Sequence, residues 1–375
     1  MSNLIYHRSE PESKKDSYLQ FDSLDFNINV GENRVLVKNS VRLLGDIKVL
    51  DNGAVPGAAV DIGFDPRCGV HSFFESVQVS FLDGPNPGQK ENLQNYARYV
   101  FMQESATKTP EDMLNASAVV ELKADDLKST ILYSKGRLTR NTGGGATVQS
   151  DQDFAMKPVC VLNKMSGGDL PMSKSGIIRL TMNLAPNHSA LCGIDLNNAQ
   201  DTYSISNVRV VYQSLPETGK EQQTVMRSVY NVKSTIQSNF ANVQARVPAV
   251  ASSVSVSLQR QDREQISPFS NYIMNKPPQV SDIQFLFNDS TNEYISYKIS
   301  DKTEMQQRYI DSFTDTGHDT VSIDRYNSNQ NFGLGLAFGG FVDLSNQKFA
   351  LQINSKIDNT QPYNCYMYFH SVVGL

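Results

Sequence analysis

The stretch Ile178-Arg-Leu-Thr-Met-Asn-Leu184 alternates apolar and polar residues along its whole length. Successive side chains of a β-strand point to opposite faces of a sheet, so this alternation predicts a strand with one face in a core and the other in water. The same rhythm recurs through the first half of the chain. Its other clear occurrences are residues 24–30, 77–81 and 208–212.

The second half of the chain repeats the pattern. Alternating segments occur at residues 254–258, 283–287, 295–299, 349–353 and 365–369. Stretches rich in Gly, Pro, Asn and Asp separate them, as expected for turns between short strands. The sequence therefore predicts an all-β fold made of sandwiches or barrels.

Helical spacing is local. In residues 91–102, Leu93, Tyr96, Ala97 and Val100 recur at intervals that place them on one helix face. Residues 225–240 show a similar spacing of apolar side chains, although β-branched residues dominate there. We expect short helices at both places.

Length and composition indicate two domains. The chain has 375 residues, whereas one compact sandwich has about 100–200. The polar stretch Gln213-Ser-Leu-Pro-Glu-Thr-Gly-Lys-Glu-Gln-Gln223 is typical of a linker. These observations divide the chain into an N-terminal arm at 1–20, a first domain at 21–215, a linker at 216–245 and a second domain at 246–375.

The charge of the chain does not favour nucleic-acid binding. The net charge is −5, and only 19% of the residues are charged. A genome-condensing arm would be a run of Lys and Arg. The N-terminal segment is instead balanced, with three cations and three acids: Arg8, Lys14 and Lys15 against Glu10, Glu12 and Asp16. We expect no specific nucleic-acid binding.

The sequence shows neither a secretory signal nor an apolar stretch of the 18 or more residues needed to span a bilayer. We therefore expect the chain to be made and assembled inside a cell. The four cysteines are widely separated and lack metal-site spacing, which predicts free buried thiols: Cys68, Cys160, Cys192 and Cys365.

No catalytic, cofactor or metal motif is found. Gly143-Gly-Gly145 lacks the lysine of a phosphate-binding loop and predicts a flexible turn. Gly333-Leu-Gly-Leu-Ala-Phe-Gly-Gly340 misses the dinucleotide-binding pattern by one place and predicts a strand where backbones approach closely. An acidic group without EF-hand spacing predicts a solvated loop: Asp311, Asp315, Asp319 and Asp324. We expect a protein that is not an enzyme and holds no cofactor.

Two quoted segments carry a family resemblance. Cys68-Gly-Val-His-Ser-Phe-Phe-Glu-Ser-Val-Gln-Val-Ser-Phe-Leu-Asp-Gly84, followed by Asn95-Tyr-Ala-Arg-Tyr-Val100, resembles the first jelly roll of the double jelly-roll major capsid proteins of tailless icosahedral viruses, the lineage of adenovirus hexon. Residues 205–212 are similar to the closing strand of that domain. Residues 280–288, 349–355 and 363–370 resemble strands of the second jelly roll.

The resemblance implies two consecutive eight-stranded jelly-roll β-sandwiches with short helices in loops, at 21–215 and 246–375. It also implies a major capsid protein of the virion that forms homotrimers with a pseudo-hexagonal outline, and a trimer–trimer lattice that tiles an icosahedral shell. Penton and minor capsid proteins would be its other partners, and the resemblance leaves open a membrane inside the shell.

The N-terminal arm is the segment for which we predict an assembly role. Leu4, Ile5 and Tyr6 form a small apolar group followed by mixed charges. A frayed terminus is the common alternative. Our hypothesis is that the arm orders against a neighbouring subunit or an inner layer.

Three alternatives remain open at this point. A trimeric viral spike or receptor-binding protein would also be β-rich, but no stalk repeat is visible. A carbohydrate-active sandwich enzyme usually has tryptophan platforms, and the chain has 0 Trp. A single jelly-roll coat protein with a protruding domain would differ in residues 220–375, which would not form a second jelly roll.

Overall fold

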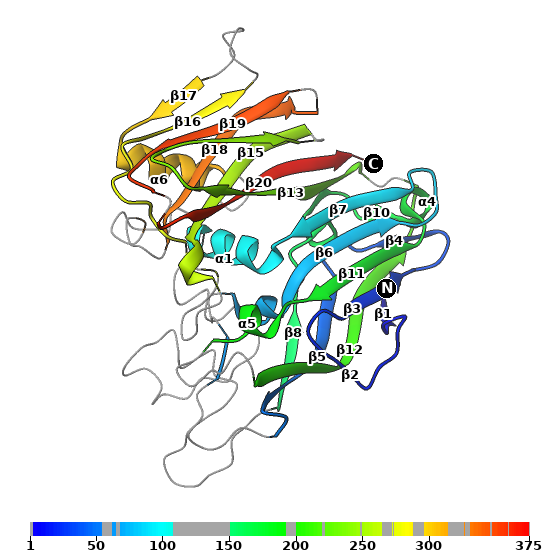
Figure 1. Ribbon diagram of the computed structural model, residues 1–375. Helices are drawn as coiled ribbons and strands as arrows, with labels where there is room; N and C mark the ends of the chain where they lie inside the picture. The colour runs from blue at the N-terminus through cyan, green and yellow to red at the C-terminus, as the bar shows by residue number, and fades with distance from the viewer. Residues whose placement is uncertain are drawn as a thin grey trace.

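The computed structural model forms two β-sandwiches that lie side by side (Figure 1). The structure describes residues 3–54, 62–64, 68–107, 151–192, 200–219, 222–247, 250–264, 272, 274–287, 296–313, 326, 331–345, 347–358 and 360–374. Strands dominate these residues, as the alternation in the sequence predicts.

The first sandwich packs a seven-stranded sheet against four strands of a second sheet. The seven-stranded sheet has the order β10-β4-β12-β5-β8, with β1 and β2 also paired to β12. Its strands are β1 (Ile5–Ser9), β2 (Ser17–Tyr18), β4 (Arg34–Leu36), β5 (Arg42–Asp51), β8 (Asp151–Met156), β10 (Leu170–Pro171) and β12 (Asp201–Pro216). The four facing strands follow the order β7-β6-β11-β3: β3 (Ser23–Ile28), β6 (Phe74–Phe81), β7 (Gly88–Gln94) and β11 (Ile178–Leu184).

The second sandwich is a complete eight-stranded jelly roll. One layer has the order β18-β15-β20-β13 and the other β14-β19-β16-β17. Ring contacts join the layers, because Phe349 lies 5.0 Å from Phe369 and Phe287 lies 4.9 Å from Phe338, centroid to centroid. Its strands are β13 (Thr224–Ile236), β14 (Phe240–Arg246), β15 (Val250–Arg260), β16 (Asp282–Phe287), β17 (Ser296–Ile299), β18 (Gly333–Asp343), β19 (Lys348–Asn354) and β20 (Tyr363–Gly374).

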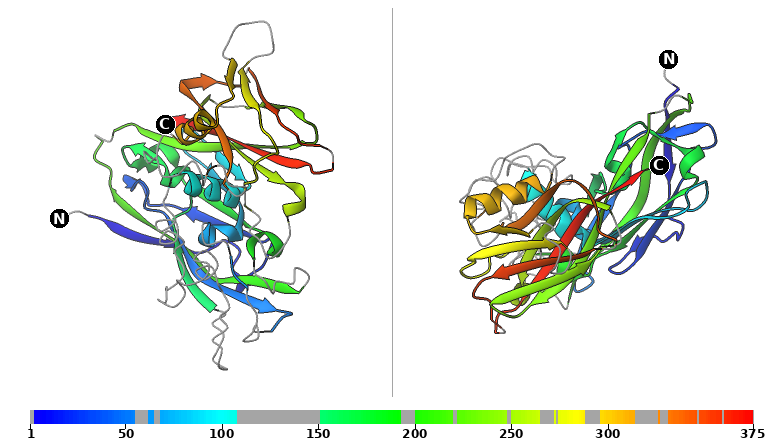
Figure 2. Two further views of the ribbon diagram at one scale, coloured as in Figure 1. Left: turned by 90° about the vertical axis from the view of Figure 1, so that its left-hand side faces the viewer. Right: turned by 90° about the horizontal axis from the view of Figure 1, so that it is seen from above.

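A single nine-stranded sheet runs through both sandwiches. Its strand order is β18-β15-β20-β13-β7-β6-β11-β3, so β13 of the second sandwich pairs directly with β7 of the first. That pairing is parallel and has one register pair, Tyr230 with Asn92. The short strand β9 (Met165–Gly167) extends the contact by pairing with the start of β13. The two sandwiches are therefore joined by backbone as well as by side chains, and Figure 2 shows them in contact from two further directions.

The alternation in the sequence builds the cores. Leu180 on β11 lies opposite Phe26 on β3 and opposite Val79 on β6, and all three side chains are fully buried. Their polar neighbours along each strand face outward. The apolar positions of neighbouring strands thus lie opposite one another. Together they form one apolar face, which packs against the facing sheet.

The helices are short. They are α1 (Tyr96–Thr107), α4 (Met172–Ser175), α5 (Asn187–Ala190) and α6 (Lys302–Asp311), with 3-10 turns η1 (Gly69–Phe73), η3 (Val161–Asn163) and η4 (Gln261–Arg263). The helix predicted at residues 91–102 begins five residues late, because residues 91–94 belong to β7. Asn95, in the left-handed region with φ of 52°, separates the strand from the helix.

The helix predicted at residues 225–240 is wrong. This segment is β13 followed by the start of β14. β13 pairs along its whole length with β20, and β7 and β9 pair with it on the other edge. Buried apolar side chains of β13 stand at both even and odd positions, Met226 and Ile236 against Val229, so its sequence loses strict alternation and imitates helical spacing.

The structure also changes the predicted segment limits. Residues 1–20 were expected to be an arm, yet β1 and β2 form the edge of the first sandwich beside β12. Residues 216–245 were expected to be a linker, yet they contain β13 and most of β14. The segment between strands is therefore residues 217–223, and the second sandwich begins at Thr224. Because this half is itself a jelly roll, a coat protein with only one jelly roll is ruled out.

Candidate functional site

Helix α1 lies between the two sandwiches (Figure 1) and is buried on nearly all sides. The second sandwich contacts the helix just before its start and in its middle. The Tyr368 hydroxyl on β20 donates a hydrogen bond of 3.1 Å to the carbonyl of Asn95, just before the helix. The Tyr309 hydroxyl on α6 donates one of 3.1 Å to the carbonyl of Met102. The helix that the sequence predicted at residues 91–102 therefore joins the two sandwiches, in addition to the shared sheet.

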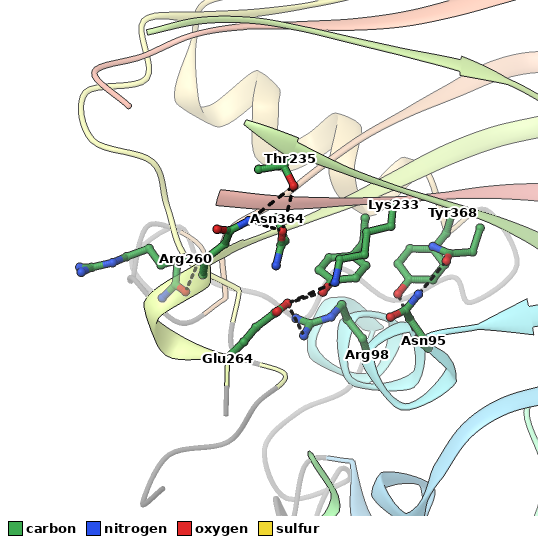
Figure 3. Close-up of polar contacts among 12 residues, drawn as sticks. Asn95, Arg98, Lys233, Thr235, Arg260, Glu264, Asn364 and Tyr368 are labelled. Carbon is green, nitrogen blue, oxygen red and sulfur yellow. Dashed lines mark hydrogen bonds and ion pairs between the residues drawn. The ribbon is translucent and has the colours of Figure 1, made fainter. Parts of the chain in front are cut away.

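A buried cation on α1 reaches into the second sandwich (Figure 3). The Arg98 side chain lies over the ring of Tyr366 on β20, 4.2 Å from its centroid. Its guanidinium lies 3.8 Å from the Glu264 carboxylate, which Lys233 on β13 also approaches at 3.9 Å. Tyr366 donates its hydroxyl proton to the same carboxylate. Burial alone would raise the pKa of Glu264, but the Tyr366 hydrogen bond and the charge of Arg98 outweigh burial and lower it.

A buried carboxylate completes the joint between β7 and β13. The Val161 amide donates to Oε2 of Glu91 at 2.7 Å, and the Val229 amide donates to Oε1 at 3.2 Å. Val161 belongs to the first sandwich and Val229 to the second, so one side chain bridges the two. Burial raises the pKa of Glu91 to about 7, although the charge of Lys164 and both amides oppose this rise. The Lys164 ammonium in turn donates to the Tyr99 hydroxyl at 2.7 Å.

Sequence reasoning missed the polar residues of this joint, which we call the junction cluster: Glu91, Arg98, Lys164, Lys233 and Glu264. One signal was available in the sequence. Glu91 is in phase with the buried Leu93 along β7, so an acid stands at an inward position of a strand. A carboxylate at such a position needs donors nearby, because burying an unpaired charge costs several kcal/mol.

Large apolar side chains lie exposed at several places around the molecule. The most exposed are Tyr6 at 73%, Phe21 at 71% and Phe341 at 62%. Further examples are Ile5, Leu19, Leu82, Phe240, Val250 and Tyr297. Several of them lie on the outermost strands of their sheets, β1, β14, β17 and β18. Exposed apolar side chains on sheet edges are typical of surfaces that contact other chains.

The structure places the predicted arm residues on or beside an edge strand. Ile5 and Tyr6 belong to β1 and pair with Ser214 and Gln213 of β12, while Leu4 directly precedes the strand and is partly buried. The His7 ring stacks on Tyr212, with 5.2 Å between the ring centroids. The backbone of this segment is thus ordered by its own chain. The Ile5 and Tyr6 side chains still face solvent.

The cysteines and acidic residues of the described part of the chain form no metal site. All four cysteines are free and buried. Among the described residues, no group of three or more His, Cys, Asp or Glu side chains is placed to hold a metal. Asp311 ends α6, and the other three acids of that predicted loop lie outside the described residues, as does Gly143-Gly-Gly145. No helix in the described part of the chain is long and apolar enough to cross a membrane.

The glycine-rich segment is a strand, as predicted. Gly333 and Gly335 lie on β18 where α6 packs against it. A Cβ atom on Gly333 would lie 2.3 Å from the Tyr309 ring, and one on Gly335 would lie 2.4 Å from the Ser312 hydroxyl oxygen. These glycines leave room for a helix to approach the sheet.

No protein-family model matches the chain, and no curated protein matches its sequence. Solved structures do resemble it. The Faustovirus major capsid protein has a TM-score of 0.61 at 10% identity, covering 100% of this chain and 90% of that chain. VP54 of the virus PBCV-1, fitted into a reconstruction of the virophage Sputnik, has a TM-score of 0.58 at 9% identity, covering 100% and 95%.

A third similar structure is that of the Sputnik virophage, with a TM-score of 0.56 at 9% identity, covering 99% of this chain and 85% of that chain. These similarities extend over both sandwiches. The chain therefore has the fold of the double jelly-roll major capsid proteins, as the sequence resemblance implies.

Proposed function

We propose that this protein is a major capsid protein of a tailless icosahedral virus, located in the virion shell. The observation that carries the proposal is the pairing of two jelly rolls in one chain. The two sandwiches are held side by side by one nine-stranded sheet, so each chain would supply two sandwiches to a shell. The similar solved structures are major capsid proteins, which supports the same role here.

Three copies of such a chain would bring six sandwiches around one axis, giving a trimer with a pseudo-hexagonal outline. Contacts within a stable trimer would bury on the order of 2,000 Å² or more each, and contacts between trimers can be smaller because many act together. The low charged content of the chain, 19%, supports close lateral packing because few charges must be desolvated. Penton and minor capsid proteins are proposed as further partners.

The exposed side chains of Ile5 and Tyr6 support a revised form of the arm hypothesis. The contact would be made by side chains of an ordered edge strand and not by a flexible arm. Nothing in the described residues offers a catalytic constellation, and we propose a structural role without enzymatic activity.

Purification of the chain expressed alone tests the proposal. Light scattering coupled to gel filtration should give the mass of a trimer, and negative-stain images should show compact particles with a hexagonal outline. A monomer at micromolar concentration, or an elongated trimer with a shaft, would contradict the capsid role. The shaft would favour the alternative of a viral spike or receptor-binding protein.

A further inference from the structure

A pocket with a volume of about 630 Å³ lies at the joint between the two sandwiches. The first sandwich and α1 supply one side of it, and neighbouring strands of the second sandwich supply the other. Its lining residues include Tyr99, Lys164, Arg227, Phe313, Phe341 and His370. The residues come from both sandwiches, so a molecule in the pocket would contact both.

The polar lining of the pocket is cationic. Lys164 and Arg227 line it, and none of the described lining residues is Asp or Glu. Burial is the largest influence on Lys164 and, with a smaller contribution from the charge of Arg227, lowers its pKa to about 8 against the opposing effects of Glu91, Cys160 and Glu104. Neither Glu91 nor Glu104 lines the pocket.

Lys164 and Arg227 both influence His370, which lines the same pocket. Burial, together with the charges of Lys164 and Arg227, lowers the pKa of His370 to about 3. Its Nε2 atom is 2.8 Å from the Ser255 hydroxyl, and its ring contacts those of Tyr99 and Phe313. The histidine is therefore neutral at pH 7, and the positive charge in the pocket comes from the lysine and the arginine.

One wall of the pocket is apolar and aromatic. Phe313 is buried, whereas Phe341 is 62% exposed. Phe341 lies in a β-bulge. Ala251 of β15 pairs with Val342, but Ser253 pairs with Ala337, so residues 338–341 of β18 lie opposite a single residue of β15. Bulges on edge strands redirect side chains, and Phe341 on this one lines the same pocket as the two cations.

We propose that this pocket binds a small ligand that carries an oxyanion, phosphate or carboxylate, on an apolar body. The oxyanion lies between Lys164 and Arg227, where charge-assisted hydrogen bonds are strong. The apolar body lies against Phe313 and Phe341. A single phosphate ion would leave most of the volume unfilled. The bound ligand would hold the two sandwiches together, since its contacts belong to both.

Calorimetric titration of the purified protein with inorganic phosphate, phenyl phosphate and benzoate tests the proposal. We expect phenyl phosphate or benzoate to bind at least about tenfold more tightly than inorganic phosphate, and the tighter of the two identifies the oxyanion. Arg227→Gln should weaken binding at least about tenfold. Phe341→Ser should remove the advantage of the aromatic probes. Arg246→Gln, an exposed arginine on β14, is the matched control and should leave binding unchanged.

Proton uptake gives a second readout that a purely structural role for Arg227 would not produce. An anion beside Lys164 raises its pKa above about 8, so binding at that pH should take up protons, measurable as a dependence of the heat on the buffer. The proposal is overturned if no probe binds the wild type at about 10 mM. It is equally overturned if Arg227→Gln and Arg246→Gln lower binding alike, which would indicate unspecific attraction of anions.

Discussion

The Arg98 guanidinium lies over the Tyr366 ring, 4.2 Å from its centroid, and this contact joins a helix of the first half of the chain to a strand of the second. Arg98 is only 5% exposed and faces the Glu264 carboxylate. A buried cation between a ring face and a carboxylate stabilises one arrangement of the two sandwiches, because any shift between them would leave a charge without its partners.

Replacement of Arg98 by Ala should therefore destabilise the protein by about 2–4 kcal/mol. The change removes the contact with Tyr366 and leaves a cavity, and it takes the Arg98 charge away from Glu264, which Lys233 still approaches at 3.9 Å. Urea unfolding measures the loss. Arg246→Ala, on an exposed face of β14, is the control and should change stability by less than about 0.5 kcal/mol. Equal effects of the two changes would contradict the role given to Arg98.

Glu91 should give the protein a specific dependence of stability on pH. Its pKa is about 7 when folded, against an ordinary value of 4.5, so the folded state holds more protons than the unfolded state between these values. Stability from this group is therefore fully present below pH 4.5 and is lost as the pH rises through about 7. Lys164, with a lowered pKa of about 8, acts in the opposite direction above that pH.

Glu91→Gln should remove this dependence, because Gln does not titrate. Urea unfolding at pH 5 and at pH 7.5 compares the two proteins, and Glu32→Gln, an exposed acid, is the control. We expect wild type and E32Q to lose stability between the two pH values by a similar amount, and E91Q to lose less. An unchanged pH slope in E91Q would show that Glu91 does not titrate in this range.

The close approach of α6 to β18 predicts contrasting effects for two glycines on the same strand. Gly333→Ala should cost about 1–3 kcal/mol, because its methyl group would overlap the buried Tyr309 ring, which is held by its hydrogen bond to Met102. Gly340→Ala should have little effect, because no atom lies within 4 Å of the added Cβ. Thermal unfolding of both variants checks the contrast, and equal melting temperatures would refute it.

The sequence predicted the strands whose apolar and polar residues alternate. The alternation in residues 178–184 identified β11 because one face of that strand is buried and the other is not. The same reasoning failed for residues 225–240, since the buried apolar residues of β13 stand at both even and odd positions and follow no strict alternation. The glycine-rich segment was correctly predicted to be a crowded strand, but the atoms nearest to Gly333 and Gly335 belong to the Tyr309 and Ser312 side chains and not, as predicted, to backbone.

The junction cluster could not be predicted because its partners are distant in the sequence. The two amides that bind Glu91 lie 70 and 138 residues from it. Tyr309 and Met102 are separated by 207 residues. No pattern within a window of ten or twenty residues contains such contacts. An inward-facing acid signals that a partner exists, but only the strand order, with β13 beside β7, identifies that partner.

Ile5 and Tyr6 provide the test of assembly that leaves the fold intact. Deletion of the N-terminal residues would remove β1 from its sheet, so a failure to assemble would have two explanations. The double variant Ile5→Ser, Tyr6→Ser keeps the backbone pairing with β12 and changes only exposed side chains. We expect its melting temperature to stay near that of the wild type, while its trimers or larger assemblies dissociate at concentrations at least about tenfold higher than wild type.

The matched control is Leu82→Ser, which replaces one exposed apolar side chain just after β6, at 42% exposure. Gel filtration with light scattering over a dilution series compares the three proteins. Assembly of the double variant at wild-type concentrations would mean that the edge strand β1 serves the fold alone. A loss shared equally with L82S would mean that exposed apolar area in general, and not this strand, drives association. If only the double variant loses assembly, β1 lies in the contact between subunits. The exposed Ile5 and Tyr6 side chains are the only groups changed, and the fold of the single chain does not depend on them.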